Sequence, residues 1–546
     1  MQKVLTAAEM REVDRLTTER YGLPSIILME NAAHAVVRAI TEKLDGPINE
    51  KSILVLCGKG NNGGDGAAAA RILWTLGARV NVYLIGALAQ TQGDAKSNFE
   101  ILKALGRPSL MIEEIESSVD LFESMASTQR IRGKFDVIVD ALFGTGVKRP
   151  LDPPYSEIIN GLAKIVKELS EPPLIVSVDL PSGLDSDSSA LPDSAFRADV
   201  TVTFSAPKPA NVLAPAAALN GELIVADIGS PSELTEEQMS NLYVTGPADL
   251  RSWLKRTEFS NSSYKNKRGH ALIIAGSENY SGAAVLCGNA AIRSGAGLVT
   301  IGAPRSSKDS IAARVVPEVI VRPLSETDTG SIAEEAIIEI GRISGNVDAI
   351  AIGSGLTAHS ESTGRLVRRI VNDRAVPMVL DADALTLLSP FGPEEIQDEK
   401  GPPLILTPHQ GEFLRMLGSK EADLVKGRVA AVREFAQKHR AIVVLKGERC
   451  LIAEPGGRVV VNPTGNSGLG KAGNGDTLTG MIVGFAAQAS AMDVDMFETV
   501  AAAVYAAGLA GDIAEMKYGK RVMTASDVRE CLADAFEAVN RSSDTA

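Results

Sequence analysis

The sequence predicts an α/β protein with two doubly wound domains, in which helices cover parallel sheets. Three observations predict this fold class. Short β-branched runs alternate with helical stretches in both halves of the chain. With 546 residues, the chain is too long for one hydrophobic core. Two glycine-rich segments that also contain Asn and Asp, residues 61–66 and 473–476, lie far apart and predict two separate ligand pockets.

The first half is expected to contain five strands, at residues 52–57, 79–85, 135–139, 174–179 and 200–204. The first strand is apolar and runs into the glycine-rich loop at residues 61–66, which leads into the strong helix former 67–74. Residues 6–44 have helical periodicity and predict an N-terminal helical cap. Three of the five strands end at chemically suggestive polar segments, and open α/β sheets bind ligands at such strand ends.

The second half shows a further series of strands, expected at residues 271–276, 298–301, 349–352, 378–380, 404–406 and 442–445, and it ends in Ala-rich helices. Between residues 230 and 256 the apolar strands disappear, and the sequence becomes acidic, polar and helical. We therefore expect the domain junction there, and we assign residues 1–235 to the first domain and 236–546 to the second. A short Ser/Asp loop lies at residues 186–189.

The composition argues against several functional classes. The formal net charge of −13 disfavours a generic nucleic-acid or anionic-membrane surface, because such binding depends on clustered Lys and Arg. The N-terminus turns polar before an apolar signal-peptide core develops, and no apolar run reaches about 18 residues, so we expect a cytoplasmic protein. Neither disulfides nor structural zinc are expected from the scattered cysteines Cys57, Cys287, Cys450 and Cys531.

Polar side chains gather at three predicted strand ends of the first half. If these strands are neighbours, Asn62, Asp140 and Ser182 offer only oxygen ligands, which is typical of a hard alkali or alkaline-earth cation site. Asp65 and Asp179 then remain available for ligand hydroxyl groups. The alternative is that all these residues only satisfy the backbone of turns. The glycine spacing is not G-x-G-x-x-G, which disfavours an ordinary nicotinamide dehydrogenase domain.

Four motifs of the first half occur in a fixed order: Leu28-Met29-Glu30-Asn31-Ala32-Ala33, residues 61–66, residues 140–146 followed by Arg149-Pro150-Leu151, and residues 178–183. Through them, roughly residues 1–235 resemble the NAD(P)H-hydrate epimerases. The resemblance implies a Rossmann-like three-layer domain that interconverts the R and S hydrates of NADH and NADPH at C6 of the nicotinamide ring, with bound potassium.

This resemblance also implies roles for individual residues. It implies that Asn62, Asp140 and Ser182 hold the potassium ion and that Asp179 is catalytic. The implied contacts to the hydrate are Asn61, Asn62, Gly63, Gly64, Asp65, Gly144, Thr145, Gly146, Val147, Lys148, Arg149, Pro150, Tyr155 and Asp179.

The second glycine-rich segment, residues 465–480, leads directly into an apolar helix. Backbone N–H groups at such a helix start can stabilise a phosphoryl group in transfer, and Asp476 stands where a base could take the proton of the acceptor hydroxyl. The segment is not a Walker A loop, because G-x-x-x-x-G-K-[ST] does not occur in it. Asp476 could instead be only a helix N-cap. Lys446-Gly447, and His409 with Glu412, follow other predicted strands and add ligand candidates.

The segments that carry His409 and Asp476, together with residues 276–284, 293–299, 353–356 and 380–385, resemble the ribokinase-like family, and within it the ADP-dependent NAD(P)H-hydrate dehydratases, over roughly residues 250–540. The loop reads Gly-Asn-Gly-Asp where Gly-Ser/Thr-Gly-Asp is more usual, and Asn keeps a small polar side chain. The implied hydrate contacts are Ala283, Gly355, His409 and Asp476, with Asp476 catalytic. The implied nucleotide contacts are Lys446, Gly447, Glu448, Arg449, Cys450, Asn466, Gly473, Asn474 and Gly475.

Together the two resemblances imply an enzyme of nicotinamide nucleotide repair. ADP with Mg²⁺ phosphorylates the C6 hydroxyl of the S hydrate, phosphate leaves, and the epimerase converts the R hydrate into the S hydrate. A homo-oligomer is expected, and the sequence does not separate ADP from ATP. Two alternatives stay open: a vitamin-alcohol kinase with an N-terminal regulatory module, and a first half that binds without catalysing. A fragment of residues 250–546 is expected to dehydrate the S hydrate by itself.

Overall fold

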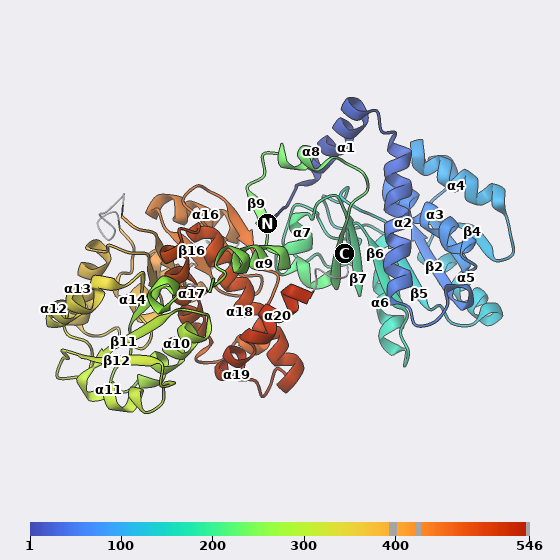
Figure 1. The fold of residues 1–546 in the computed structure, drawn as a ribbon. Coiled ribbons are helices and arrows are strands. Elements are labelled where there is room, and N and C mark those ends of the chain that lie inside the picture. The colour runs from blue at the N-terminus through green and yellow to red at the C-terminus, as the bar shows by residue number, and fades with distance from the viewer. Residues whose placement is uncertain (262, 393–400, 422–426, 542–546) are drawn as a thin grey trace. The chain divides into compact units, whose positions relative to one another are not determined.

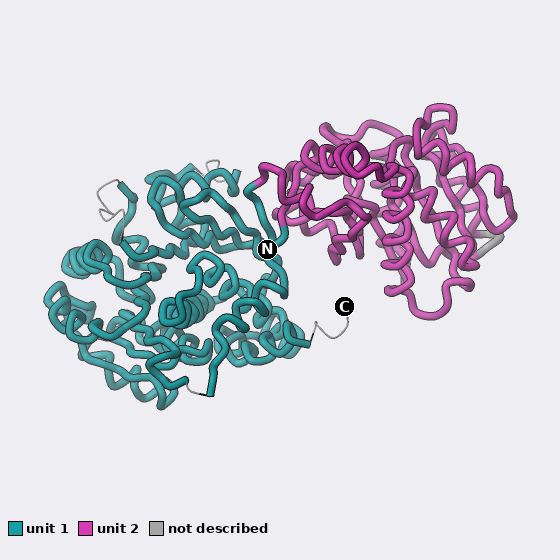
Figure 2. The backbone as a smooth tube through the Cα atoms, turned by 45° about the horizontal axis from the view of Figure 1, so that its top comes forward, with its two compact units in different colours: residues 1–2, 241–546 teal, residues 3–240 magenta. Residues whose placement is uncertain are grey.

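The computed structural model describes residues 1–261, 263–392, 401–421 and 427–541. It confirms the predicted fold class, because helices cover two largely parallel sheets (Figure 1). The chain divides into two compact units, unit 1 with residues 1–2 and 241–546 and unit 2 with residues 3–240 (Figure 2). The predicted domain limit at residues 235 and 236 stays a prediction, and the structure divides the chain between Ser240 and Asn241.

Unit 2 is built around a parallel sheet of seven strands in the order β4-β3-β2-β5-β6-β7-β8. The strands are β2 (Ser52–Cys57), β3 (Arg79–Ile85), β4 (Leu110–Ile115), β5 (Val137–Ala141), β6 (Leu174–Val178), β7 (Val200–Phe204) and β8 (Glu222–Ala226). The helices are α1 (Ala7–Tyr21), α2 (Ser25–Lys43), α3 (Asn61–Thr75), α4 (Gly93–Leu105), α5 (Ser118–Arg132), α6 (Tyr155–Glu168), α7 (Pro209–Val212) and α8 (Ser232–Glu236).

The sheet of unit 2 has helices on both faces. Ile53 and Val55 pack in a buried cluster with α2, α3 and α4, whereas Leu54 and Leu56 pack with α5 and α6. Successive side chains of a strand point to opposite faces, so a strand covered on both faces is apolar at every position. This explains why β2 is an uninterrupted apolar run in the sequence.

Two strands of unit 2, β4 and β8, were not predicted, and both lie at edges of the sheet. Edge strands are partly exposed, so their apolar pattern is weaker: β4 carries exposed and half-exposed residues in its middle. The predicted N-terminal helical cap consists of two helices, α1 and α2. Gly22, with φ +70°, ends α1, and Pro24 precedes α2.

Unit 1 is built around an 11-stranded sheet in the order β1-β9-β18-β17-β16-β15-β14-β13-β10-β11-β12. From β9 to β12 the pairs are parallel, except where β17 pairs with its two neighbours. The strands are β1 (Gln2–Lys3), β9 (Leu242–Val244), β10 (His270–Ile274), β11 (Leu298–Pro304), β12 (Val319–Leu324), β13 (Ala349–Ile352), β14 (Met378–Leu380), β15 (Leu404–Leu406), β16 (Ile442–Leu445), β17 (Leu451–Ala453) and β18 (Val459–Val461).

Twelve helices are described in unit 1 within the residues given above. They are α9 (Pro247–Arg256), α10 (Ser281–Arg293), α11 (Arg305–Ala312), α12 (Ile337–Ile343), α13 (Glu361–Asn372), α14 (Ala382–Leu387), α15 (Gln410–Met416), α16 (Arg428–His439), α17 (Asn474–Met492), α18 (Met496–Tyr518), α19 (Ala525–Glu530) and α20 (Leu532–Arg541).

The expectation that the junction lacks strands is wrong, because β9 lies within it and pairs with β18. A strand of three residues between polar segments carries little apolar signal, and the same holds for β1, β17 and β18. A fragment that begins at residue 250 would lack β9 and would cut into α9. The fragment that keeps these elements begins at Asn241.

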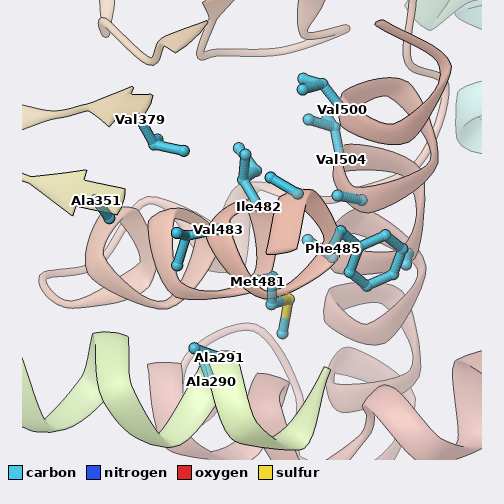
Figure 3. Close-up of a cluster of buried hydrophobic side chains, with 14 of the residues drawn as sticks. Ala290, Ala291, Ala351, Val379, Met481, Ile482, Val483, Phe485, Val500 and Val504 are labelled. Carbon is cyan, nitrogen blue, oxygen red and sulfur yellow. The ribbon is translucent and has the colours of Figure 1, made fainter. Parts of the chain in front are cut away.

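The core of unit 1 is centred on α17, which lies between α10, α18 and the sheet (Figure 3). Its residue Phe485 stacks on Trp253 of α9 with ring centroids 4.0 Å apart. The helix α18 is long and apolar enough to cross a membrane by length and composition alone, but 72% of its most apolar window is buried in the protein, as expected of a core helix. All four cysteine thiols are free and buried.

Candidate active sites

The candidate site of unit 2 lies where the chain reverses its direction across the sheet. The strands β3 and β4 extend to one side of β2, whereas β5 and β6 lie on the other side. In such sheets, the crevice at the carboxyl ends of the two central strands is the usual ligand site. The segments that follow β2, β5 and β6 meet there, so the three predicted strand ends are neighbours.

The glycine-rich segment of unit 2 was predicted as a loop, and this prediction is wrong. The segment forms the first turns of α3, which begins at Asn61. Its glycines serve close packing and not unusual backbone angles. A Cβ on Gly63 would lie 1.8 Å from the carbonyl oxygen of Gly58, and one on Gly66 would lie 2.5 Å from the Cβ of Ala141. The start of α3, with its free N–H groups, is therefore held tightly against the sheet at the crevice.

Asp140 and Ser182 are in direct contact. The buried Asp140 carboxylate accepts hydrogen bonds from the Ser182 N–H at 2.8 Å, the Ser182 hydroxyl at 2.5 Å and the Ser177 hydroxyl at 2.9 Å. Burial raises the pKa of Asp140 to about 6, although these hydrogen bonds lower it. Among the described residues no Lys, Arg or His forms an ion pair with Asp140.

Asn62 lies next to this pair. Its amide oxygen is 3.1 Å from the position that a Cβ on Gly144 would take, and its amide nitrogen is buried without a hydrogen-bond partner. Phe143, which precedes Gly144, donates its backbone N–H to the Ser182 hydroxyl at 2.9 Å. Asn62, Asp140 and Ser182 thus offer three oxygen donors that carry one formal charge, and the buried Asp140 carboxylate that bears it has no cationic neighbour among the described residues. Such a set fits a monovalent cation.

Asp179 has a strained backbone, with φ +65°, directly after β6. A residue other than glycine held in this region costs on the order of 1–3 kcal/mol, and such residues concentrate at functional sites. Its Oδ1 accepts hydrogen bonds from the Lys208 ammonium at 2.7 Å and the Thr203 hydroxyl at 3.0 Å. Its Oδ2 is 3.0 Å from the position of a Cβ on Gly144. One oxygen of Asp179 is thus anchored, and the other faces the Gly144 segment.

The predicted hydrate-binding segment 144–150 is only partly at the crevice. Gly144 lies between Asn62 and Asp179, and Val147 is buried. Lys148 forms ion pairs with Asp185 and Asp187. The remaining predicted contacts of the segment are Thr145, Gly146, Arg149 and Pro150, and the Arg149 side chain is 84% exposed.

Tyr155 begins α6 and packs edge-on against Phe143, with ring centroids 4.6 Å apart. Its hydroxyl donates to the carbonyl oxygen of Ile85 at 3.3 Å. Burial raises the pKa of the Tyr155 hydroxyl. Tyr155 therefore packs against Phe143, the residue before Gly144, and supports it from behind the Gly144 segment.

The candidate site of unit 1 occupies the corresponding position in the second sheet. The strands β11 and β12 extend to one side of β10, and β13 to β16 to the other. At the carboxyl ends of β14 and β16, the Lys446 ammonium donates to Oδ1 of the buried Asp381 at 2.7 Å. Asp381 also accepts hydrogen bonds from the hydroxyls of Thr407 and Thr479, both at 2.8 Å. Burial lowers the pKa of Lys446, but the Asp381 and Glu412 carboxylates outweigh it, and the pKa is raised.

Asp476 lies in the first turn of α17, after Gly473 in the left-handed conformation with φ +90°. The side chain does not cap the helix, because the N-cap is Gly473. Burial raises the pKa of Asp476 and the carboxylates of Asp381 and Asp383 add to this effect, whereas the Ser354 hydroxyl and Lys446 oppose it. A Cβ on Gly475 would lie 3.6 Å from the Lys446 ammonium. The start of α17, the Lys446 ammonium and the Asp476 carboxylate, whose pKa is raised, therefore surround one small space.

His409 caps α15. Its Nδ1 accepts the N–H groups of Gly411 at 3.0 Å and Glu412 at 3.2 Å, so a neutral His409 carries its proton on Nε2. In return, the Glu412 carboxylate accepts a hydrogen bond from the backbone N–H of His409. Its Oε2 lies 3.9 Å from the Lys446 ammonium nitrogen. The imidazole is 55% exposed, so its outer edge is accessible to a ligand.

Ala283 and Gly355 lie side by side. A Cβ on Gly355 would lie 3.0 Å from the Cβ of Ala283 and 2.9 Å from the Cβ of Tyr280, whose side chain is exposed. The hydroxyl of the adjacent Ser354 is buried and interacts with the Asp476 carboxylate, whose pKa it lowers. Two small residues beside this pair leave room for a ligand close to Asp476.

The predicted nucleotide contacts have different environments. Lys446, Gly473, Asn474 and Gly475 belong to the space around Asp476, and the Asn474 Oδ1 is buried without a partner. The Cys450 side chain packs in the hydrophobic core, and burial raises its pKa to about 12. Asn466 uses its side chain to hold its own loop, through Gly468, Gly511 and Asp512. The remaining predicted contacts are Gly447, Glu448 and Arg449.

Several residues of both sites were missing from the predicted set. Lys208 and Thr203 hold Asp179, whereas in unit 1 Asp381 holds Lys446 and Thr479 holds Asp381. For Asp381 the sequence carried a signal, because it directly follows a short apolar strand in the segment Leu-Asp-Ala-Asp-Ala-Leu. Among the described residues, no group of three or more His, Cys, Asp or Glu could hold a metal ion.

Comparisons with known proteins divide the chain in the same way. A family profile described as YjeF-related protein N-terminus matches residues 25–210, and one described as NAD(P)H-hydrate dehydratase matches residues 271–533. The chain is 38% identical to the bifunctional NAD(P)H-hydrate repair enzyme Nnr of Moorella thermoacetica, over 97% of this chain and 96% of that protein. It is 35% identical to the protein of the same name in Salinibacter ruber, over 97% and 95%.

Among solved structures, unit 1 is similar to the ADP/ATP-dependent NAD(P)H-hydrate dehydratase of Bacillus subtilis, co-crystallised with ATP and Mg²⁺. The identity is 31%, the TM-score is 0.47, and the match covers 55% of this chain and 100% of that chain.

Proposed function

The chain belongs to the family of bifunctional NAD(P)H-hydrate repair enzymes, and from this premise we propose how its side chains carry out the two reactions. Unit 2 interconverts the R and S hydrates of NADH and NADPH, and unit 1 converts the S hydrate into NADH or NADPH at the expense of ADP. The relatives match both halves of the chain, so they do not support a vitamin-alcohol kinase with a regulatory module. The cytoplasmic location and the homo-oligomeric state stay predictions.

The observation that carries the assignment in unit 1 is the arrangement of Asp476, Lys446 and Gly475 around one space. Asp476 takes the proton of the C6 hydroxyl as that oxygen attacks the terminal phosphoryl group of the nucleotide. The first N–H groups of α17 and the Lys446 ammonium stabilise the charge on the phosphoryl oxygens. Phosphate then leaves C6 while the proton of C5 passes to solvent, and the C5–H electron pair forms the double bond that restores the dihydropyridine. ADP becomes AMP, and the oxygen of the hydrate leaves in the phosphate.

The remaining predicted contacts of unit 1 fit this scheme. Ala283, Gly355 and the outer edge of His409 would border the hydrate, and Asn474 and Gly475 would approach the nucleotide phosphates. Mg²⁺ would be held mainly by phosphate oxygens, since it binds nucleotides with few protein ligands. The Cys450 thiol is buried in the core, so only its backbone could reach the nucleotide.

In unit 2, the free Oδ2 of Asp179 is the base beside the hydrate, and the Lys208 ammonium pairs with the other oxygen and orients the carboxylate. Asn62, Asp140 and Ser182 would hold potassium. The ion would offset the charge of the buried Asp140 and fix the ends of β2, β5 and β6. The proton transfers would be made by carboxyl groups.

The potassium site makes a testable prediction. Asp140→Ala should lower R-to-S exchange by about tenfold or more and abolish its dependence on potassium, because the variant removes the only formal charge among the ligands. Exchange is measured in potassium-free buffer and during titration with potassium. Ser177→Ala is the matched control, because it removes one hydrogen bond to Asp140 but no proposed ligand. S-hydrate dehydration should stay unchanged in both variants. If the rate of R-to-S exchange depends neither on potassium nor on Asp140, the potassium site is excluded.

The function itself is tested with purified R and S hydrates, with ADP or ATP, by recovery of NADH absorbance. The full chain should consume both hydrates. A fragment of residues 241–546 should consume the S hydrate but stall on the R hydrate, apart from its spontaneous epimerisation. If the fragment consumes both hydrates equally fast, unit 2 is not the epimerase. A stable phosphate ester in place of free phosphate would instead indicate a kinase.

A further inference from the structure

Three carboxyl groups near the crevice of unit 2 differ in their hydrogen bonding. Asp179 accepts two hydrogen bonds, whereas no backbone or side-chain donor of the described residues reaches Asp65 on α3 or Asp14 on α1. An ionised carboxylate that is withdrawn from water without a donor is strongly disfavoured, and a protonated carboxyl is not. Asp65 is half-buried and has no such donor, so it differs from Asp179 in what it can hold: a proton rather than a charge.

Lys208 cannot neutralise the other two carboxyl groups directly. Its ammonium has three N–H groups, and they donate to Asp179, to the Thr203 hydroxyl and to the carbonyl oxygen of Phe204. The ammonium is buried, with the side chain 2% exposed. The cation is thus committed to Asp179, with which it forms an ion pair.

We propose that Asp65 is the proton donor of the epimerase and that Asp14 is a positioning residue that keeps the proton on Asp65. This inference rests on the proposed function of unit 2. It assigns to the two carboxyl groups of the crevice opposite tasks: Asp179 accepts a proton, and Asp65 gives one. Enzymes commonly divide acid and base work in this way, between two carboxyl groups whose surroundings differ.

The electrostatics of the crevice support this division. Burial raises the pKa of Asp65 well above its ordinary value, and the carboxylates of Asp179 and Asp14 raise it further. Burial raises the pKa of Asp14 to about 6, against the lowering effect of Lys208. Near pH 7 Asp14 is therefore mostly ionised, and its negative charge opposes ionisation of Asp65.

The proton transfers balance in the epimerisation. The Asp65 carboxyl gives its proton to the C6 hydroxyl as the C6–O bond breaks, and the lone pair of N1 forms the C6–N1 double bond. The hydroxyl leaves as water. A water molecule then adds to the opposite face of C6, its second proton goes to Asp179, and the N1 lone pair is restored. Solvent returns the proton from Asp179 to Asp65, and no group is oxidised or reduced.

Asp65→Asn tests the donor role in the full-length chain. The amide keeps the size of the side chain but cannot give a proton, so kcat for R-to-S exchange should fall by about 10²-fold or more, with KM little changed. Asp65→Glu should recover part of kcat, because it restores an acid. The uncatalysed exchange is subtracted. A kcat close to that of the unmodified chain in Asp65→Asn overturns the proposal.

Asp14→Asn tests the positioning role through the pH profile. An acid is active while protonated, so exchange is lost as the pH rises through the pKa of Asp65. Removing the charge of Asp14 lowers that pKa, and the alkaline limb should move to lower pH, with kcat at acidic pH retained. The other titratable groups that interact with Asp65 are Asp179 and the Cys57 thiol, and Lys208 interacts with Asp14; all three are unchanged in this variant.

An alkaline limb that stays in place in Asp14→Asn overturns the positioning role, and this measurement also decides the matter if Asp65→Asn does not fold. Failure of the proposed function looks different. If the unmodified chain dehydrates the S hydrate but exchanges R and S no faster than buffer, unit 2 is not an epimerase. If it exchanges them and Asp65→Asn does so equally well, only the assignment of Asp65 fails.

Discussion

Replacing Asp476 by Asn is expected to lower the turnover of S-hydrate dehydration by about 10²-fold or more, the range of a lost general base. The carboxylate is the proton acceptor at the start of α17, and Asn keeps its size and its place in the first turn. Because burial raises the pKa of Asp476, and a base acts while ionised, dehydration by the unmodified chain should decline on acidification at a higher pH than an ordinary Asp would allow. Steady-state assays of NADH recovery across pH measure both effects.

The same molecule supplies the control for Asp476→Asn. R-to-S exchange in unit 2 should be unaffected. The melting temperature of unit 1 should stay the same or rise, because a carboxylate whose pKa is raised by folding destabilises the folded state when it is ionised at neutral pH. Dehydration near the original rate would show that Asp476 has only a structural role.

Gly63→Ala is expected to cost unit 2 about 3 kcal/mol or more of its free energy of unfolding and to abolish R-to-S exchange. The added Cβ would lie 1.8 Å from the carbonyl oxygen of Gly58, and that strand end cannot retreat, because a Cβ on Gly58 would itself lie 2.0 Å from the carbonyl oxygen of Leu142. Any relief moves the start of α3, which carries Asn62 and Asp65. Trp74 lies in α3 and the other tryptophan, Trp253, lies in unit 1, so tryptophan fluorescence during urea unfolding of a Trp253→Phe background reports on this helix.

Gly60→Ala is the matched control for Gly63→Ala. Gly60 precedes α3 with φ −93°, and a Cβ there would have no atom within 4 Å. This variant should unfold within about 1 kcal/mol of the original chain and keep its exchange activity. Equal behaviour of the two alanine variants would mean that the glycines are not there for close packing.

Much of the site in unit 2 was predictable because its residues stand in short segments directly after apolar strands. Asn62 and Asp179 could be placed together once the strands were taken as neighbours. Lys208 could not, since it lies 29 residues beyond Asp179 and an isolated Lys before Pro carries no sign of a partner. Only the pairing of β6 with β7 brings the two together. The predicted end of a strand therefore locates a site, but it does not identify a residue such as Lys208 that provides the opposite charge in that site.

The site in unit 1 shows the same limit. Asp381 and Lys446 each follow a strand, but they are 65 residues apart, and Thr479 is 98 residues from Asp381. The glycine-rich segment 61–66 differs from its prediction for another reason. Glycine indicates a loop in the sequence, whereas at residues 63 and 66 it permits close approach of the helix start to the sheet. Sequence alone does not separate these two uses.

The position of β1 bears on the order in which the chain folds. The first residues of the chain belong to the sheet of unit 1, next to β9, so the whole of unit 2 is an insertion between two adjacent strands. Within unit 2 the two ends are already joined: Lys3 donates to the carbonyl oxygen of Gln238 at 2.8 Å, and Ser240 to that of Val4 at 2.6 Å. Once the inserted unit has folded on the ribosome, the loop that β1 and β9 must close is short, and its entropy cost falls accordingly. The edge of the dehydratase sheet is thus prepared by the folding of the epimerase.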